Sequence, residues 1–446
     1  MNNDKIYTIG ILDNIDLKGD LPTTMTGNNI LVGGSRTNHK FLYAYVGNRI
    51  FQSINSGTTW ADKGENPHYF FSQNSFNTSN VNANLIFVGG IDLYKSENSG
   101  DSWSIVNNWS EYYGNVSSML HADIPEVRFF LDNDFNEVAL ISTDGGIYIS
   151  YDEIETVQNL SMEGLGVSQY YSTYTKRIDP FHVYAGSQDQ GFQRSLYPTD
   201  GILNFEQSIS GDYGHLVSSD GGESLWCNYP GFTMYYENPE TDTGGLSLSF
   251  PSSGQLWLPP LMEHPYDNNK VYITGWKYGG TAFVWTMDID GSNQTMEELP
   301  GKFSEGQRII VHNGDVYVGG YFDNGSCYWK NGTKINLTTN ADSEAFDIAV
   351  FNGKAVAVGW FMSHHKIYAA RWVDGKRTTI HSKGDAEPRE IMVIGNKYYI
   401  SGWAANNFNM QNQRAAIWEG TVKTAKLLKP GNDPKLKQAS GGHHAA

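Results

Sequence analysis

The sequence predicts an all-β protein, a β-propeller in which about eight to ten four-stranded blades form a single ring. The main observation is a repeat between Val271 and Gly420. In each copy a short alternating strand ends in Gly and an aromatic residue, and a second strand ends in Trp. The closing tryptophans lie 44, 43 and 46 residues apart, at Trp285, Trp329, Trp372 and Trp418. A period of about 40–45 residues is typical of propeller blades, which must stack on one another to bury both faces.

Turn signals and composition agree with this architecture. Asp290-Gly291, Asn331-Gly332 and Asp374-Gly375 separate strands of the repeat, and such pairs favour tight hairpin turns. The 446 residues include 48 Gly, 27 Tyr, 21 Phe and 12 Trp, which suits many turns and half-buried strands. No long stretch carries apolar residues at helical spacing, so the pattern disfavours helical and α/β folds.

The first part of the chain carries a different repeat. After weakly patterned residues 1–40, hairpins of the form Ser-x-Asp/Asn-x-Gly-x-Thr/Ser-Trp occur at 53–60 and 96–103. We expect the Asn side chain to bind backbone amides across the turn, Gly to take a positive φ, and Trp to fold back as an apolar plug. Weaker copies begin at Ser142, Ser187 and Ser218.

The repeat changes style near residue 300. We expect Asp-box blades over 1–300, Gly-aromatic blades over 301–420 that close the same ring, and a flexible tail over 421–446. Only about three blades follow residue 300, too few for a ring of their own, so one ring is favoured over two. Residues 5–11 or 29–33 are candidates for the strand that closes the ring.

Composition argues against several functions. The net charge of −17 disfavours nucleic-acid partners and attraction to anionic membranes, since both need clustered Lys and Arg. No apolar run approaches the length of a membrane span, and the residues after Met1 lack the regions of a signal peptide. Cys227 and Cys327 could form one bridge, but two unpaired core thiols are favoured.

The hairpins at 53–60 and 96–103 resemble the BNR (Asp-box) and sortilin (VPS10)-like propeller repeats. The motifs Ala185–Gly191 and Ser210–His215 are similar to those of large secreted or surface propeller proteins of Bacteroidetes-type bacteria. This resemblance implies an extracellular or cell-surface protein, with any signal peptide absent from this chain. The same repeats occur in sialidases, xyloglucan-cleaving glycosidases and sortilin-type receptors, so they imply a fold and not an activity. The Arg-Ile-Pro segment of sialidases is absent.

Four aromatic residues share one phase of the repeat, directly after the Gly that ends a strand: Trp276, Tyr321, Trp360 and Trp403. Equivalent positions in successive blades should form an arc on one side of the ring. Aromatic faces stack on sugar rings, so these residues are candidates for ligand binding. His121 and His215 are further candidates for the same role. The favoured alternative is that each fills the gap between neighbouring blades. The repeat-closing tryptophans are expected in the core.

Three aspartates are the candidates for catalysis if the protein is an enzyme: Asp123, Asp189 and Asp212. Each lies in a short motif that ends a strand, beside His121, Gln188 or His215. A glycoside hydrolase needs two carboxylates, one as acid and one as base or nucleophile. Asp189 also occupies the aspartate position of an Asp box, and a structural role is favoured for all three.

We predict no metal site and no cofactor. Closely spaced oxygens that could bind Ca²⁺ occur at Asp132 and Asp134 and at Asp288 and Asp290, but neither pair has the downstream Glu of an EF-hand, and exposed turns explain both. His364-His365 is expected in a surface loop. No P-loop, dinucleotide fingerprint or nucleophile elbow occurs.

These observations favour a non-catalytic recognition protein, secreted or displayed at the cell surface, that binds glycan or protein on one face of the propeller. The alternatives are a glycoside hydrolase with paired carboxylates at the central funnel, and a structural component of a surface or phage-like assembly. An enzyme would lose turnover when Asp189 or Asp212 becomes Asn. A binding protein would lose affinity on Trp360→Ala or Trp403→Ala without forming product.

Overall fold

The computed structural model describes most of the chain. The described ranges are 5–9, 15–20, 30–66, 71–72, 74–162, 168–195, 204–242, 244–250, 257–267, 269–277, 279–323, 325–338, 342–381, 383–408, 413–420 and 426–427. Within them the only helices are two short 3-10 turns, η1 (Trp109–Gly114) and η2 (Leu160–Met162). No helix of these ranges is long and apolar enough to cross a membrane.

Nine four-stranded antiparallel sheets follow one another along the described chain. In each sheet the strands pair in the order in which the sequence forms them. This meander is the arrangement of a propeller blade, so the prediction of a propeller with eight to ten blades is confirmed. Of the two segments considered for ring closure, β1 (Lys5–Ile9) pairs instead with β2 (Ile15–Asp20), and β3 (Ile30–Gly34) opens the first sheet by pairing with β4 (Leu42–Val46).

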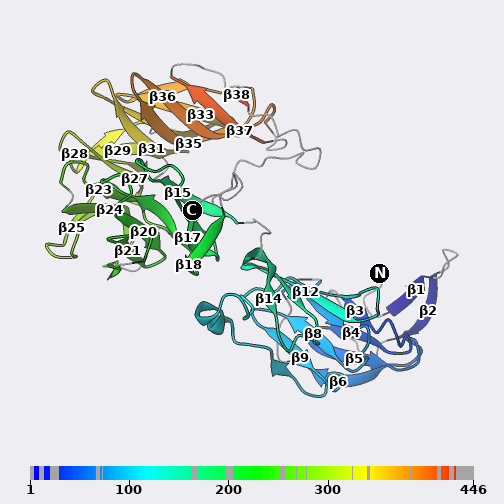
Figure 1. The fold of residues 1–446 in the computed structure, drawn as a ribbon. Helices are drawn as coiled ribbons and strands as arrows, with labels where there is room; N and C mark the ends of the chain where they lie inside the picture. Colours follow the sequence, from blue (N-terminus) through cyan, green and yellow to red (C-terminus); the bar gives the residue numbers. More distant parts are fainter. Residues whose placement is uncertain are drawn as a thin grey trace. The chain divides into compact units, whose positions relative to one another are not determined.

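The chain forms two compact units. The first comprises Met1–Gln169, Gln188–Gly191 and Ile209–Gly211. After the β1–β2 hairpin it holds three sheets (Figure 1): β3, β4, β5 (Arg49–Ser53) and β6 (Ala61–Glu65); β7 (Phe76–Thr78), β8 (Ile86–Gly89), β9 (Leu93–Ser96) and β10 (Ser104–Ile105); β11 (Glu126–Leu131), β12 (Glu137–Thr143), β13 (Gly146–Ser150) and β14 (Gln158–Asn159).

The second unit comprises Tyr170–Ser187, Phe192–Ser208 and Asp212–Ala446. Its six sheets are β15 (Tyr170–Thr175), β16 (Val183–Ser187), β17 (Gly191–Ser195) and β18 (Phe205–Ile209); β19 (Gly214–Val217), β20 (Leu225–Tyr229), β21 (Phe232–Tyr236) and β22 (Leu246–Ser249); β23 (Leu261–Glu263), β24 (Lys270–Lys277), β25 (Thr281–Asp288) and β26 (Thr295–Glu298); β27 (Glu305–His312), β28 (Asp315–Phe322), β29 (Gly325–Lys330) and β30 (Thr333–Asn336); β31 (Ser343–Phe351), β32 (Lys354–Ser363), β33 (Lys366–Val373) and β34 (Lys376–Thr379); β35 (Ala386–Ile394), β36 (Lys397–Ala404), β37 (Arg414–Glu419) and β38 (Lys426–Leu427).

Two predicted boundaries can be compared with these units. The change of repeat style at residue 300 falls inside the second unit, between β26 and β27, and stays a prediction about repeat class. In the predicted tail 421–446, Lys426–Leu427 pairs with β37 as β38. The other residues of that tail lie outside the described ranges.

Within each unit, the first strand of a sheet contacts the first strand of the next. In the second unit β15, β19, β23, β27, β31 and β35 meet in this order, and in the first unit β3 meets β7 and β7 meets β11. These strands therefore occupy the inner position of propeller blades. Apolar side chains of adjoining sheets fill the space between them, as where Val358 and Tyr398 share one core cluster.

The repeat-closing tryptophans lie in this core, as predicted. Trp285, Trp329, Trp372 and Trp418 are at most 1% exposed. Three of their indoles also bind the segment that leads into their own sheet, because a buried N–H needs an acceptor. The indole N–H groups donate from Trp329 to Pro300 O (2.9 Å), from Trp372 to Thr338 Oγ1 (3.1 Å) and from Trp418 to Ile380 O (2.9 Å).

The same segments are bound to the preceding sheet as well. The amide of Leu299 donates to the carbonyl oxygen of Ala282 (2.8 Å), that of Leu337 to Ser326 (3.0 Å) and that of Ile380 to Ala369 (2.9 Å). Each acceptor lies on the third strand of the sheet before. Each linker therefore joins two sheets through directional bonds in addition to apolar packing.

The hairpin turns of the first half have the hydrogen bonds that their sequence predicts. In the first, Ser53 Oγ accepts from the Gly57 amide (2.9 Å), Asn55 Oδ1 accepts from the Thr59 amide (2.9 Å), and Gly57 has φ 84°. The turn that begins at Ser96 repeats these bonds. Near the weak copy predicted at Ser142, it is the hairpin that follows which carries these bonds. There the same pattern of hydrogen bonds involves Ser150, Asp152 and Thr156. Ile154 occupies the Gly position of that turn, with φ 63°.

One further prediction is settled by the state of the two cysteines. Cys227 and Cys327 are both free and buried, which confirms unpaired core thiols.

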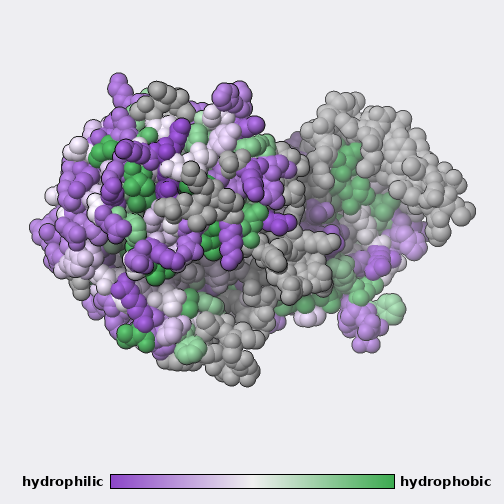
Figure 2. Space-filling view, turned by 90° about the horizontal axis from the view of Figure 1, so that it is seen from above, coloured by the Kyte–Doolittle hydropathy of each residue, from purple (hydrophilic) through white to green (hydrophobic). Residues whose placement is uncertain are grey.

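On the face drawn in Figure 2, the described residues are mostly hydrophilic and the hydrophobic ones gather in small separate groups. A recognition surface on that face would therefore not be one broad apolar patch.

The substitution Trp372→Ala should lower the free energy of unfolding of the second unit by about 3–5 kcal/mol, because it opens a cavity and leaves Thr338 without its indole partner. Urea unfolding followed by near-UV circular dichroism measures this. The matched control is Trp257→Ala in the same unit, where the side chain is 50% exposed and the cost should stay below about 1 kcal/mol. Equal costs for the two variants would contradict this account of the core.

Candidate functional site

Residues from five sheets of the second unit, and from the segment just before β23, line one cavity of about 800 Å³. Most of the strand residues belong to the inner strands, and the others belong to β36 and β37. The lining consists of Tyr170, Tyr171, Ser172, Thr173, His215, Leu216, Val217, Trp257, Leu258, Pro260, Gln307, Arg308, Phe346, Asp347, Arg389, Glu390, Met392, Ser401, Gly402, Trp403 and Ala415. Its volume lies within the range of about 300–1,000 Å³ that small-molecule sites occupy.

Irregular pairing of the inner strands places these residues. In β27, β31 and β35 the register shifts by one residue after Gly306, Ala345 and Pro388, and β15 and β19 shift in the same way. The extra residues of the first three bulges are Gln307, Phe346 and Arg389, and all three line the cavity. A bulge inserts one unpaired residue and turns its side chain out of the alternation of the strand.

A glutamate before each bulge faces the aromatic residue of the repeat. Tyr321 Oη donates to Glu305 Oε2 (2.9 Å) and Trp360 Nε1 to Glu344 Oε2 (3.0 Å), while Glu387 pairs in register with Trp403. Burial raises the pKa values of the Glu305 and Glu344 carboxyl groups. Tyr321 and Trp360 therefore hold a partly buried carboxyl group of the inner strand in place.

Steric constraints require a glycine before each of these aromatic residues. A Cβ at Gly320, Gly359 or Gly402 would lie 2.0, 1.9 or 2.1 Å from the backbone oxygen of the facing glutamate. Only glycine lets the second strand approach the bulged inner strand this closely. The Gly-aromatic signature of the sequence is thus a consequence of the bulges that line the cavity.

Asp347 links three inner strands at the cavity wall. Its Oδ2 accepts a hydrogen bond from the amide of Ile391 on β35 (2.8 Å), and its Oδ1 accepts one from the amide of Ile348 (2.7 Å). The same Oδ1 lies 3.3 Å from Nε of Arg308 on β27, but the two groups are not aligned for a hydrogen bond. The side chain is 4% exposed. Burial raises the pKa of Asp347 to about 6, and the positive charge of Arg308 opposes this rise.

Aromatic faces form much of the remaining lining. Trp257 is 50% exposed although tryptophan is usually well covered. The guanidinium of Arg389 lies 4.1 Å from the ring centre of Phe346 and is paired with Glu387 Oε2 at 2.5 Å. The protein therefore holds the arginine in place at the cavity wall.

Of the four aromatics that the sequence singles out, Trp403 lines this cavity, where it is 1% exposed. Trp276, Tyr321 and Trp360 are partly exposed and are not among the lining residues. Tyr321 and Trp360 bind the inner-strand glutamates instead. Their role in ligand binding stays a prediction.

The three predicted aspartates are divided between the units. In the first unit, Asp123 (φ 60°) and Asp189 (φ 59°) are partly buried, and Asp189 Oδ1 lies 3.8 Å from Nε2 of His121, which is 6% exposed. In the second unit, Asp212 Oδ1 accepts from Tyr171 Oη (3.2 Å), and His215 lines the cavity. Their catalytic role stays a prediction.

The oxygens considered for Ca²⁺ serve their own turns. Asp132 Oδ1 accepts from the amides of Asp134 and Asn136, both at 2.8 Å, and Asp290 Oδ1 accepts from the amide of Ser292 at 2.9 Å. Asp288 Oδ2 accepts from the Asn293 side chain at 2.6 Å. In the part of the chain that the structure describes, no three His, Cys, Asp or Glu side chains gather as a metal site would require.

Sequence reasoning missed the residues of the bulges and Trp257. One signal was present for the first group, because a glutamate occurs 16 residues before the repeat aromatic three times, at Glu305, Glu344 and Glu387. The residues two and three positions after this glutamate line the cavity. No local pattern marks Trp257, since it lies outside any strand.

The raised pKa of Asp347 predicts a pH dependence of stability. Between about pH 4 and 6 the native state keeps a proton that the unfolded chain has lost, so the free energy of unfolding falls as the pH rises, by up to about 3 kcal/mol from this group. Asp347→Asn should remove this part of the slope in urea unfolding from pH 4 to 7. Asp323→Asn, an exposed control in the same unit, should keep it. If the free energy of unfolding varied with pH in the same way for wild type and Asp347→Asn, Asp347 would not be the source of the pH dependence.

Comparison with known proteins yields no family. No family model matches the chain, and no curated protein does. Among solved structures, the extracellular domain of a hybrid two-component system from B. thetaiotaomicron aligns with 95% of this chain and 58% of its own, at 16% identity and TM-score 0.40. The β-propeller domain of Swd1 from Myceliophteria thermophila aligns with 59% and 86%, at 11% identity and TM-score 0.40. An ancestral GH74 enzyme aligns with 94% and 66%, at 14% identity and TM-score 0.25. These values do not indicate a ligand or an activity.

Proposed function

We propose that the protein is a recognition propeller that binds a neutral saccharide in the cavity of its second unit. The observation that supports this most is the set of bulges that turn side chains of successive inner strands into one space. Bulges recur where a side chain must be redirected toward a ligand. Five inner strands of one unit share such a shift.

The lining favours a saccharide over a strongly charged ligand. Arg308 and Arg389 are matched by the carboxylates of Asp347 and Glu387, which hold them at 3.3 and 2.5 Å. A ligand charge would have to compete with these pairs. Aromatic faces such as Trp257, together with amide and hydroxyl groups, can instead stack on sugar rings and bind their hydroxyls.

An extracellular or cell-surface location is part of the same proposal. It is supported by the resemblance of the hairpins at 53–60 and 96–103 to the repeats of secreted propeller proteins. A protein ligand in place of a glycan is the nearest alternative, because the aromatic and arginine groups of the cavity also suit a peptide.

A glycoside hydrolase is the second candidate, and one observation favours it. Asp347 and Glu390 line the same cavity, and Asp347 binds the amide of Ile391, the residue next to Glu390. A carboxyl group whose pKa is near 6 can act as a general acid, and a second carboxylate in the same cavity can serve as base or nucleophile. Asp347 and Glu390 thus replace the three aspartates as the pair to test first.

Trp257→Ala should abolish the retardation of the protein in affinity gels that contain its polysaccharide, with an expected loss of about tenfold or more in affinity for one stacking residue. Trp109→Ala is the matched control, because that indole is 41% exposed and belongs to the first unit. Phe346→Ala tests a second cavity residue. Retention of full affinity by both cavity variants would contradict the proposed site.

The same gels distinguish the hydrolase. Soaked glycans are examined for shortened products with wild type, Asp347→Asn and Glu390→Gln. Products that disappear in both carboxyl variants would identify an enzyme and overturn the non-catalytic assignment. Retardation without products supports recognition alone, and neither retardation nor products would move the search to a peptide ligand.

A further inference from the structure

A second cavity, of about 580 Å³, is lined by residues of the sheet β31–β34 and of the segment that leads into it. Thr338 and Asp342 flank it on one side, and Phe361, Ser363, His364, His365 and Arg377 on the other. None of these residues belongs to the saccharide cavity described above. A function of this second cavity does not depend on the proposed recognition of saccharides.

Arg377 gives this cavity a cation without an internal counterion. Its guanidinium carbon lies 3.7 Å from the ring centre of Phe361, and no carboxylate of a described residue lies within ion-pair distance of it. Packing desolvates the guanidinium and lowers the pKa of Arg377. Arg377 is exposed on β34, and its planar N–H edge matches an oxyanion.

The two histidines occupy a turn for which they are poorly suited. His364 (φ 50°) and His365 (φ 60°) are the two central residues of the hairpin between β32 and β33, where Ser363 pairs with Lys366. Four other two-residue turns in the same two sheets carry Asn or Asp followed by Gly: Asn313-Gly314, Asn331-Gly332, Asn352-Gly353 and Asp374-Gly375. Positive φ at both positions favours Asn-Gly over any pair of larger side chains.

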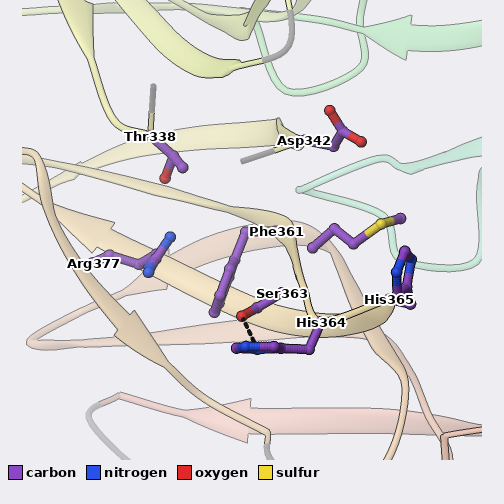
Figure 3. A pocket seen from close by; sticks show the side chains of 8 residues that line it. Thr338, Asp342, Phe361, Ser363, His364, His365 and Arg377 are labelled. Carbon is purple, nitrogen blue, oxygen red and sulfur yellow. Dashed lines mark hydrogen bonds between the residues drawn. The ribbon is translucent and has the colours of Figure 1, made fainter. Parts of the chain in front are cut away.

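The turn therefore keeps two imidazoles at the rim of the cavity at the expense of local stability. Figure 3 shows the His364 ring beneath Ser363, on the side of Phe361 and Arg377, and the two labelled imidazoles pointing in different directions. Ser363 Oγ and His364 Nδ1 lie 3.1 Å apart, so the other ring nitrogen of His364 is available to a ligand. Diverging rings do not form a metal site, and no such cluster occurs among the described residues.

We propose that this cavity binds a small ligand through an oxyanion group, a carboxylate or phosphate, held by Arg377 and the imidazole of His364. The Thr338 hydroxyl, which accepts from the Trp372 indole at 3.1 Å, can donate its own hydrogen to the same group. Asp342 lies on the opposite side of the cavity with its carboxylate turned away from Arg377 (Figure 3), where it can accept from a ligand hydroxyl.

Isothermal titration calorimetry of the full chain with inorganic phosphate, glucuronate and glucose tests this site. Phosphate or glucuronate should bind and glucose should not. Arg377→Gln should weaken anion binding by about tenfold or more, whereas Lys376→Gln, the same charge change at the neighbouring exposed position, should leave it unchanged. Tighter binding of glucuronate than phosphate would identify an acidic saccharide as the ligand, and the reverse a free phosphate.

The double variant His364→Asn/His365→Gly restores the turn used elsewhere in these sheets. It should raise the melting temperature by about 2–4 °C and at the same time weaken anion binding. A turn that is only structural would gain stability with unchanged binding. Trp257→Ala should not alter anion binding, so failure of this site and failure of the saccharide cavity are separable.

Three results would overturn the proposal. They are no binding of either anion to wild type, binding that survives in Arg377→Gln or in the double variant, and equal weakening by Lys376→Gln.

Discussion

A four-stranded sheet has two faces to bury, and in this chain only the sheets before and after it can cover them. Apolar contact alone would let neighbouring sheets slide, because it has no direction. The linkers remove this freedom. Leu299, Leu337 and Ile380 bind the third strand of the sheet before through their amides, and the next sheet binds the same segments through a buried indole. The spacing of the inner strands, and with it the cavity, depends on these directional bonds.

Given that spacing, the cavity is built by departures from regular pairing. A regular strand sends alternate side chains to opposite faces, and both faces of a blade are covered by neighbours. One extra residue in β27, β31 and β35 frees a side chain from this alternation and directs it to the space that the inner strands share. Asp347 stabilises the arrangement by bonding across to β35, and its buried charge destabilises the unit in return. Asp347 therefore helps to shape the cavity at the expense of the stability of the second unit.

The sequence was a good guide to whatever repeats. Turn pairs such as Asn331-Gly332, the periodic tryptophans and the Ser53 and Ser96 hairpins predicted the blades, because each signal is local and recurs at every sheet. The sites were harder to foresee. A bulge changes a register by one residue, and its extra residue has no distinctive type, so Gln307 and Phe346 look like ordinary strand residues. The aromatic arc was found for its periodicity, but a shared repeat phase does not reveal that Trp360 faces a glutamate. Asp123 and Asp189 were chosen for motifs that end strands, and nothing local tells which unit such a loop joins.

The double attachment of the linkers also bears on how such a chain can change length. A gene segment that runs from one linker to the next carries the amide that binds the sheet before and the tryptophan that binds its own linker. Duplication of that segment adds a whole sheet and leaves no indole or amide unpaired. A segment cut within a sheet would leave one partner of each bond buried without the other. Each such unpaired group would lower the free energy of unfolding by about 1–3 kcal/mol. The second unit is therefore suited to grow or shrink in evolution by whole sheets.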